Sequence, residues 1–193
     1  REALAGEIVG SSAGGEQPKF SCFARTASGD AHVLVKFTAP QLSAVSVRWG
    51  DLLLAEASAL STLADAGIAA SDAVALQGED GQVFLEAKRF DCEGVTGRRA
   101  IVSLEAVQSE FVTASASWPH TVNKLVQAGI VETMAAGRVE KIWAFGRLIG
   151  NSDMHAGNLS FYYSGLPLSL APVYDMLPMA FAPSGAGMMR EET

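Results

Sequence analysis

The sequence has 193 residues, 49% of them apolar, and a net charge of −7 from 14 basic and 21 acidic side chains. This length is enough for one substantial core or two small lobes, and the acidic balance argues against a nucleic-acid surface, which needs clustered Lys and Arg. No apolar run approaches the roughly 18 residues of a membrane span and no signal segment opens the chain, so we expect a soluble, cytoplasmic protein. Cys22 and Cys92 form no Cys-x-x-Cys pair, which indicates reduced thiols. The chain begins at Arg1 without a Met, which is typical of a piece of a longer protein.

The first informative stretch is a glycine-rich segment at residues 10–20, just before a β-like run. Glycines allow backbone N–H groups to approach phosphate oxygens closely. The segment is not a Walker A loop, because no Gly-Lys-Ser or Gly-Lys-Thr follows the spacer, and many such loops are ordinary turns. Residues 20–25 and 32–37 then read as two strands of a hairpin joined by a turn rich in Ser, Gly and Asp.

A lysine and a glutamate after this loop are predicted to pair. Lys36 shares a strand face with Leu34, and Glu56 falls on the apolar stripe of a helix predicted over 46–66, which ends at Gly67. A carboxylate on a buried stripe is costly unless it is paired, and Lys36 is the nearest partner. Protein kinases use such a pair to hold the lysine against the α- and β-phosphates. A solvent-exposed lysine and a half-exposed glutamate are the alternative.

The next stretch predicts a second hairpin, from strands at 74–77 and 82–87. Residues 88–94 then become polar, and in a two-lobed nucleotide site this is where the linker runs with its backbone facing the adenine. We place the lobe boundary at 94–99, which divides the chain into an N-lobe at 1–93 and a C-lobe at 94–193.

Helical patterns dominate the second half. Helices are predicted over 103–116, 122–129 and 139–149, with an interruption at Trp118-Pro-His120. The last helix is apolar over most of its circumference, so we expect it to be the central buried helix of the C-lobe. A short hairpin of 159–163 and 168–171 follows and would carry the later chain back toward the loop at 151–158. The tail at 179–189 is expected to be mobile.

The loop at 151–158 holds the residues with the most specific chemistry. Asp153 and Asn158 have the Asp-x-x-x-x-Asn spacing by which one loop offers a carboxylate to a substrate hydroxyl and an amide oxygen to Mg²⁺. Asp175, between Tyr174 and Met176, supplies a second acid. Each of these residues alone reads as readily as a helix or turn cap. Together with the glycine-rich loop and Lys36, they predict a kinase-type phosphoryl-transfer site.

The same residues resemble those of the HipA family of serine/threonine kinases, the toxins of type II toxin–antitoxin systems. The likeness covers nearly the whole chain, and the Asn-x-Asp-Met-His-x-Gly-Asn block is its most specific part. Segments 145–151 and 171–183 are most similar to the YjjJ-type branch. The other motifs that carry the resemblance are Ser12-Ala-Gly-Gly-Glu-Gln-Pro-Lys19, Val35-Lys36-Phe37, Arg89-Phe-Asp91 and Tyr174-Asp175.

The resemblance implies an α+β, bilobal, protein-kinase-like fold, with an antiparallel β N-lobe and a mainly helical C-lobe. It implies ATP and Mg²⁺ as cofactors, a protein substrate of which aminoacyl-tRNA synthetases are the family's characteristic example, and a HipB-like antitoxin as a partner. Asp153 would be the catalytic base, with Asn158 and Asp175 as metal ligands. The nucleotide-binding residues would be Ser12, Gly14, Gly15, Glu16, Gln17, Pro18, Lys19, Lys36, Glu56, Lys88, Arg89, Phe90, His155, Asn158, Tyr174 and Asp175.

In the family a serine of the glycine-rich loop is autophosphorylated. Ser12 matches that position, although Ser11 beside it leaves the choice open. The family's HipA toxin also carries an N-terminal subdomain and further helices that this sequence lacks. Two alternatives remain: a small-molecule kinase of the aminoglycoside or choline type, and a catalytically silent module that binds a partner.

Overall fold

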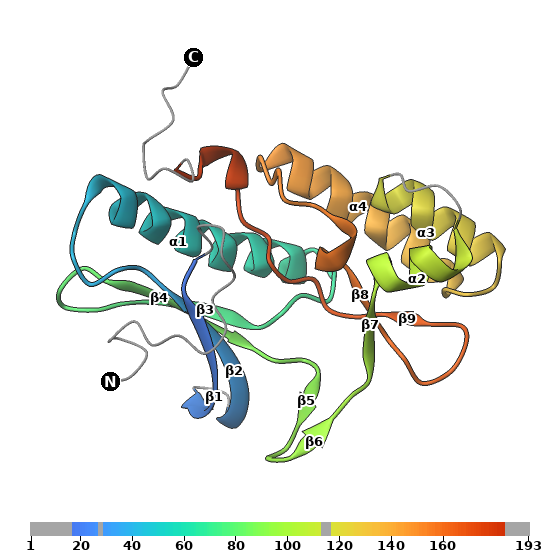
Figure 1. The fold of residues 1–193 in the computed structure, drawn as a ribbon, viewed down its shortest axis with the longest axis horizontal. Helices are drawn as coiled ribbons and strands as arrows, with labels where there is room; N and C mark the ends of the chain where they lie inside the picture. The colour runs from blue at the N-terminus through green and yellow to red at the C-terminus, as the bar shows by residue number, and fades with distance from the viewer. Residues whose placement is uncertain (1–16, 27–28, 113–116, 184–193) are drawn as a thin grey trace.

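The N-terminal part of the molecule is an antiparallel sheet backed by one long helix. The computed structural model describes residues 17–26, 29–112 and 117–183. Four strands lie in the order β1-β2-β4-β3, and α1 (Ala44–Asp65) packs against β3 and β4 (Figure 1). The strands are β1 (Lys19–Thr26), β2 (Gly29–Phe37), β3 (Ala73–Gln77) and β4 (Val83–Lys88), which confirms both predicted hairpins.

Local chemistry fixes both ends of α1. At its start Ser43 and Ser46 form a capping box, with Ser43 Oγ accepting from the Ser46 N–H at 3.0 Å and Ser46 Oγ accepting from the Ser43 N–H at 2.7 Å. At its end Gly67 takes a φ of +75°, a conformation that glycine adopts without strain. The helix therefore presents one defined stripe to the sheet, and that stripe includes Glu56.

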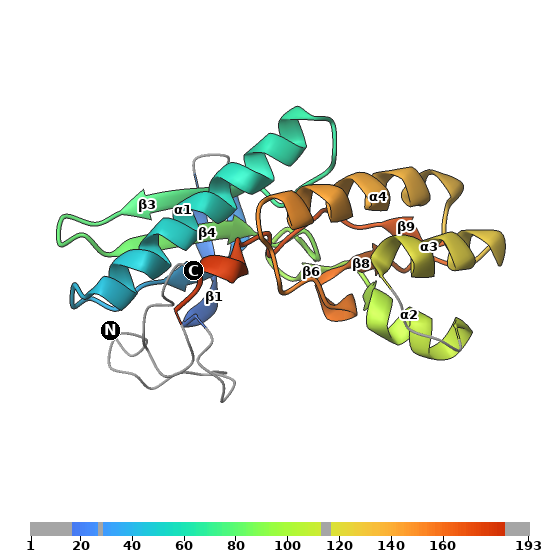
Figure 2. The same cartoon turned by 90° about the horizontal axis from the view of Figure 1, so that it is seen from above.

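The second part of the chain is mainly helical and lies beside the sheet (Figure 2). Helix α4 packs along α3, and a small antiparallel sheet in the order β7-β8-β9 lies below the helices in the view of Figure 1. The predicted hairpin of 159–163 and 168–171 corresponds to β8 and β9. The elements are β5 (Cys92–Glu93), β6 (Gly97–Arg98), β7 (Ile101–Ser103), α2 (Leu104–Phe111), α3 (Trp118–Gln127), α4 (Thr133–Leu148), β8 (Ser160–Tyr162) and β9 (Ser169–Leu170).

One hydrophobic core joins the two parts. Leu60 and Leu63 from the end of α1 belong to the same buried cluster as Val122 of α3 and Ile142 of α4. The chain after β9 also returns to the N-terminal part, because the Ser71 N–H donates to the carbonyl of Val173 at 2.7 Å and the Val173 N–H donates to the carbonyl of Ala69 at 2.9 Å. The two parts are thus held together by burial and by backbone hydrogen bonds, and the division at residue 93 stays a prediction.

The structure corrects two predictions about the helices. Trp118 and Pro119 do not interrupt a helix but begin α3, because proline is compatible with the first turn, where its missing N–H has no partner to lose. Helix α4 is not buried all round: its buried residues form one stripe, and Leu148 is 83% exposed. Cys22 and Cys92 are free thiols, as predicted. None of the helices in the described part of the chain has the length and apolar character needed to cross a bilayer.

Candidate functional site

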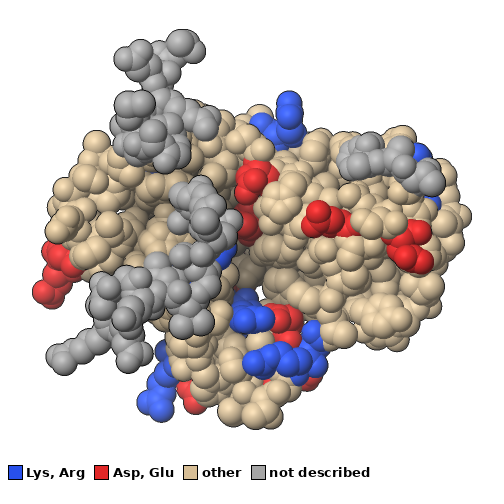
Figure 3. Space-filling model, viewed as in Figure 1, with Lys and Arg blue, Asp and Glu red and all other residues tan. Residues whose placement is uncertain are grey.

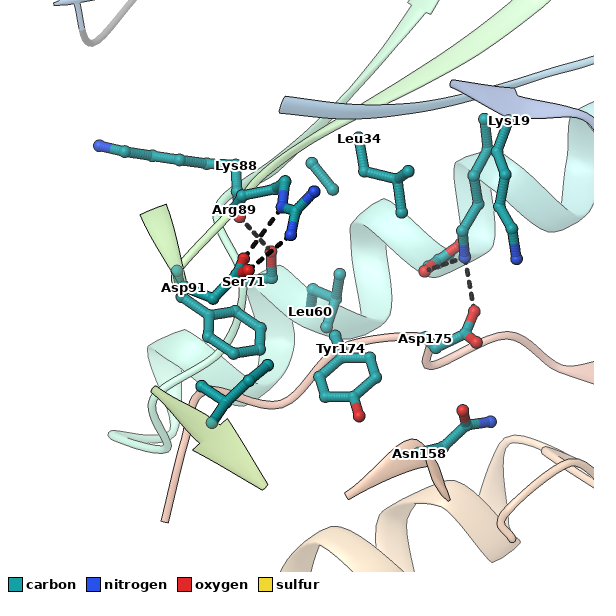
Figure 4. A pocket seen from close by; sticks show the side chains of 15 residues that line it. Lys19, Leu34, Leu60, Ser71, Lys88, Arg89, Asp91, Asn158, Tyr174 and Asp175 are labelled. Atoms are coloured by element: carbon teal, nitrogen blue, oxygen red, sulfur yellow. Dashed lines mark hydrogen bonds and ion pairs between the residues drawn. The ribbon is translucent and has the colours of Figure 1, made fainter. Parts of the chain in front are cut away.

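A pocket of about 380 Å³ lies where the two parts meet. Figure 3 shows the surface hollowed in this region, with basic and acidic side chains around the hollow. The β-sheet contributes Lys19 and Lys36, α1 contributes Glu56, and the returning chain contributes Tyr174 and Asp175 (Figure 4). These residues are far apart in the sequence, so the site exists only in the folded chain.

Three charged groups meet on one side of this pocket. Lys36 Nζ lies 2.8 Å from each carboxylate oxygen of Glu56 and 2.5 Å from Oδ1 of Asp175. Lys36 is 7% exposed and Glu56 is 2% exposed. The predicted ion pair between strand and helix is therefore confirmed. The contact with Asp175 adds a carboxylate from the other end of the chain to the same ammonium group.

The pKa values of this cluster follow from burial and from the unequal number of charges. Burial lowers the pKa of Lys36, but the carboxylates of Glu56 and Asp175 outweigh it, so the pKa is raised and the ammonium stays charged. Burial raises the pKa of Glu56, Lys36 lowers it and repulsion by Asp175 raises it, and the net pKa is about 7. Lys19 also lowers the pKa of Glu56, but less than Lys36 does, and the two ammonium groups do not offset the effect of burial.

Asp175 is held in place by its own segment. Its φ of 57° lies in the left-handed region, which is uncommon for a residue other than glycine. The backbone therefore turns at this position. Beside it the Tyr174 hydroxyl donates to the carbonyl of Gly157 at 2.9 Å and lies 2.8 Å from Ser160 Oγ. Burial raises the pKa of Tyr174, so this hydroxyl stays protonated and can donate. The returning segment is thereby fixed against residues 157–160.

The loop at 151–158 is ordered by two asparagines. Buried Asn151 accepts from the Asp153 N–H through Oδ1 at 3.0 Å and donates to the carbonyl of Asp175 at 3.4 Å. Asn158 donates through Nδ2 to the carbonyl of Asp153 at 2.9 Å, which leaves its Oδ1 directed toward Asp175 (Figure 4). From the sequence, Asn151 was interpreted as one of several potential ligands on this loop, whereas the structure shows that it orders the loop through its hydrogen bonds.

The opposite end of the pocket is formed by the predicted linker. Lys88, Arg89 and Phe90 all line it. The ring of Phe90 lies 5.6 Å from that of Tyr174, centroid to centroid, which gives an aromatic wall suited to a flat ring. Arg89 donates to Asp91 at 2.9 and 2.5 Å, and this hydrogen bonding lowers the pKa of Asp91. Six further residues line the pocket but were not among the nucleotide-binding residues predicted from the sequence: Leu34, Leu60, Ser71, Ala87, Asp91 and Ile101.

Asp153 and His155 lie elsewhere. Both are exposed and line a second depression of about 260 Å³ at the end of α4, with neither among the residues that line the first pocket. His155 accepts from the Gly157 N–H through Nδ1 at 3.1 Å, and its carbonyl accepts from Trp118 Nε1 at 3.1 Å. The structure therefore does not place His155 in the pocket where the resemblance had implied it.

The predicted glycine-rich loop is described only at its end. Ser11, Ser12, Gly14, Gly15 and Glu16 lie outside the described residues. Gln17 donates through Nε2 to the carbonyl of Phe37, and the Pro18 carbonyl accepts from the Phe37 N–H at 3.1 Å. Of the described loop residues Lys19 lines the pocket, directly opposite Lys36 in the β1–β2 register.

The donor set fits a nucleotide that arrives with magnesium. Asp175 and the amide oxygen of Asn158 offer oxygen atoms, the ligand type that Mg²⁺ prefers. Mg²⁺ commonly takes one or two protein ligands together with substrate phosphates. The described residues contain no cluster of three or more His, Cys, Asp or Glu side chains that could hold a metal. A pocket volume of about 380 Å³ lies within the usual range for small-molecule sites.

Comparison with known proteins identifies the family. The sequence profile of the HipA-like C-terminal domain matches residues 11–192. The chain belongs to the HipA-like family. This HipA-like chain is 61% identical over 190 residues to the protein named Toxin YjjJ of Escherichia coli strain K12, an alignment that covers 98% of the chain and 43% of the relative. The chain thus spans less than half the length of that relative.

Two solved structures show that the fold is kinase-like. The HipA-like chain resembles a Shewanella oneidensis MR-1 chain from a complex of HipA, HipB and operator DNA, with a TM-score of 0.60 and 21% identity over 91% of this chain and 45% of that one. It also resembles the Helicobacter pylori proinflammatory kinase CtkA, with a TM-score of 0.61 and 16% identity over 88% of this chain and 55% of that one. At these identities the likeness concerns the fold, and it confirms the predicted bilobal, kinase-like class.

Proposed function

We propose that this chain is the kinase core of a HipA-like toxin and transfers a phosphoryl group from ATP, with Mg²⁺, to a serine or threonine of a protein. The observation that carries the proposal is the contact of Lys36 with both Glu56 and Asp175 in a pocket that Asn158 also lines. Kinases need an ammonium group held by a helix glutamate beside a metal-binding aspartate. The described residues provide each of these parts.

Each residue has a distinct task in this proposal. Lys36 and Lys19 attract the phosphates, while Asp175 and Asn158 hold the metal, which offsets the phosphate charge when bound. Phe90 and Tyr174 pack against the adenine of ATP. Asp153 orients the acceptor hydroxyl and takes its proton. Catalysis then consists mainly of positioning and of electrostatic stabilisation.

The identity of the partners is a further part of the proposal. On the family resemblance, the acceptor protein is an aminoacyl-tRNA synthetase. The Shewanella structure contains HipA together with HipB, so we extend the proposal to a HipB-like antitoxin as binding partner. We also propose that Ser12, or Ser11 beside it, is autophosphorylated. A phosphate there would add about −1.5 to −2 charges beside the nucleotide phosphates, and ATP should then bind more weakly.

Labelled ATP tests the phosphoryl transfer directly. With ATP and Mg²⁺ the wild type should incorporate phosphate into protein, and mass spectrometry should find it on Ser11 or Ser12. Asp153→Asn should reduce the rate by about 10²–10⁴. Asp65→Asn, on the exposed side of α1, is the matched control and should keep the wild-type rate. A normal rate in Asp153→Asn, or phosphate on soluble metabolites alone, would contradict the proposal.

A further inference from the structure

A further cavity, here called the linker cavity, lies beside the linker where the β5–β6 hairpin begins and ends (Figure 1). Cys92, Glu93 and Arg99 from this hairpin line it, together with Tyr162 of β8. None of these four residues lines the first pocket. The volume of about 350 Å³ is within the usual range for small-molecule sites. The linker cavity is therefore large enough for a ligand of its own.

The guanidinium group of Arg99 is held in a fixed position in this cavity. Its Cζ lies 3.7 Å from the centroid of the Tyr162 ring, a cation–π contact. The Arg99 N–H donates to the carbonyl of Asp91 at 2.8 Å, and the Tyr162 hydroxyl donates to the carbonyl of Phe90 at 3.4 Å. Arg99 forms no ion pair with any residue in the described ranges. A positioned guanidinium of this kind can bind a carboxylate through two parallel hydrogen bonds.

The linker cavity carries charges of both signs. Arg89 also lines it, but its guanidinium already makes two hydrogen bonds to Asp91. A ligand of a single sign would be attracted by half of the remaining charges and repelled by the other half, whereas a zwitterion can pair with both. Two basic and two acidic side chains remain, and none of them has an ion-pair partner among the residues that the structure describes: Lys88, Arg99, Asp72 and Glu93.

The rest of the cavity wall is largely apolar. The rings of Phe90 and Tyr162 meet edge to face, with 6.2 Å between their centroids and 86° between their planes. Ala70 and Pro172 add aliphatic surface. Aromatic and aliphatic groups of this kind bind a hydrocarbon side chain. The cavity thus combines a carboxylate-binding guanidinium, acidic groups and an apolar wall.

We infer that the linker cavity binds a free α-amino acid with an apolar side chain. The guanidinium of Arg99 donates to the ligand carboxylate, and the carboxylates of Asp72 and Glu93 accept from its ammonium group. The ligand side chain packs against Phe90 and Tyr162. The inference does not depend on phosphoryl transfer, because Arg99, Glu93 and Tyr162 have no task in the proposed reaction.

Alkylation of the two free cysteines tests the inference without relying on turnover. Cys92 lines the linker cavity, and Cys22 on β1 does not. Iodoacetamide labelling of each thiol is followed by peptide mass spectrometry while phenylalanine is raised from micromolar to millimolar concentrations. Phenylalanine should slow the labelling of Cys92 and leave that of Cys22 unchanged. Arg99→Gln should raise the concentration needed for half-protection about tenfold, the effect of losing a hydrogen bond from a charged donor.

Arg98→Gln is the matched control, because Arg98 is the adjacent exposed arginine, donates to the carbonyl of Gly97 at 3.0 Å and does not line the linker cavity. It should keep the wild-type protection of Cys92. An unchanged labelling rate of Cys22 in each variant shows that the fold is intact.

Two analogues of phenylalanine separate its charges. Hydrocinnamate lacks the ammonium group and phenethylamine lacks the carboxylate, so both should protect Cys92 less than phenylalanine does. Asp72→Asn/Glu93→Gln should remove the advantage of phenylalanine over hydrocinnamate. Labelling of Cys92 that millimolar phenylalanine does not slow, equal protection in the wild type and Arg99→Gln, or equal protection of the wild type by phenylalanine and hydrocinnamate would overturn the inference.

Discussion

Replacing Lys36 with methionine is expected to destabilise the protein by an amount that grows above pH 7. The reason is Glu56, which is 2% exposed and whose pKa is raised from 4.5 to about 7. A carboxyl group with a raised folded-state pKa contributes stability that is complete below its unfolded pKa and is lost as the pH rises through the folded pKa. In the wild type this loss therefore runs from about pH 4.5 to about pH 7 and then stops.

Without the ammonium of Lys36, the pKa of Glu56 rises further. Lys36 lowers the pKa of Glu56 in the wild type, and buried glutamates without a partner reach values of about 8–9. The loss of stability then continues above pH 7 at about 1.4 kcal/mol per pH unit. The free energy of unfolding of Lys36→Met, relative to the wild type, should thus fall by about 2 kcal/mol between pH 7 and pH 8.5.

Urea unfolding followed by tryptophan fluorescence at the two pH values measures this difference. The double variant Lys36→Met/Glu56→Gln is the matched control, because Glu56 is the only buried carboxyl group among the described residues and this variant lacks it. Its cost should be equal at both pH values. If Lys36→Met cost the same free energy at pH 7 and pH 8.5, the reasoning from the buried charge cluster would be refuted.

Two further predictions concern the chain around the site. Arg89 lowers the pKa of Asp91, so their interaction should stabilise the protein fully above the ordinary aspartate pKa of 3.8. This stabilisation should be lost as the pH falls through the pKa of Asp91 in the folded protein. In urea unfolding, Asp91→Asn should therefore cost about 1 kcal/mol at pH 7 and less at pH 3. Gly150 has a φ of +76° and a Cβ there would lie 3.1 Å from Phe181, so Gly150→Ala should cost about 1–2 kcal/mol. Gly137→Ala, at an open position of α4, should instead stabilise by about 0.5–1 kcal/mol, and an equal effect of both substitutions on the melting temperature would contradict this account.

The sequence contained enough information to predict the Lys36–Glu56 pair. Glu56 interrupts an apolar helical stripe, and a strand lysine nearby is the economical way to neutralise it. The contact of Lys36 with Asp175 could not be predicted in the same way, because it depends on hydrogen bonds between residues 69–71 and Val173. Such long-range backbone pairing leaves no periodic signal in either segment. The family resemblance predicted a metal site at Asp175 and Asn158 facing Lys36, but not a direct ion pair between Lys36 and Asp175.

The errors have equally local causes. The Trp-Pro pair at 118–119 was interpreted as a helix break, whereas proline there occupies the first turn of α3. Helix α4 begins at Thr133, six residues before its predicted start at 139, because the small Ala135 provides its first buried contact and alanine gives a weak apolar pattern. The placement of His155 depends on Trp118 and Gly157, neither of which the spacing of the loop residues reveals.

Isothermal titration of ATP in the presence and absence of Mg²⁺, with the wild type and with Asp175→Asn, tests the central claim most directly. If the proposed function is right, the wild type binds ATP more tightly when Mg²⁺ is present, because Asp175 and Asn158 would then hold the metal beside Lys36. Asp175→Asn should lose this dependence on Mg²⁺. ATP binding that is absent in the wild type, or that keeps its full dependence on Mg²⁺ in Asp175→Asn, would contradict the assignment of this pocket.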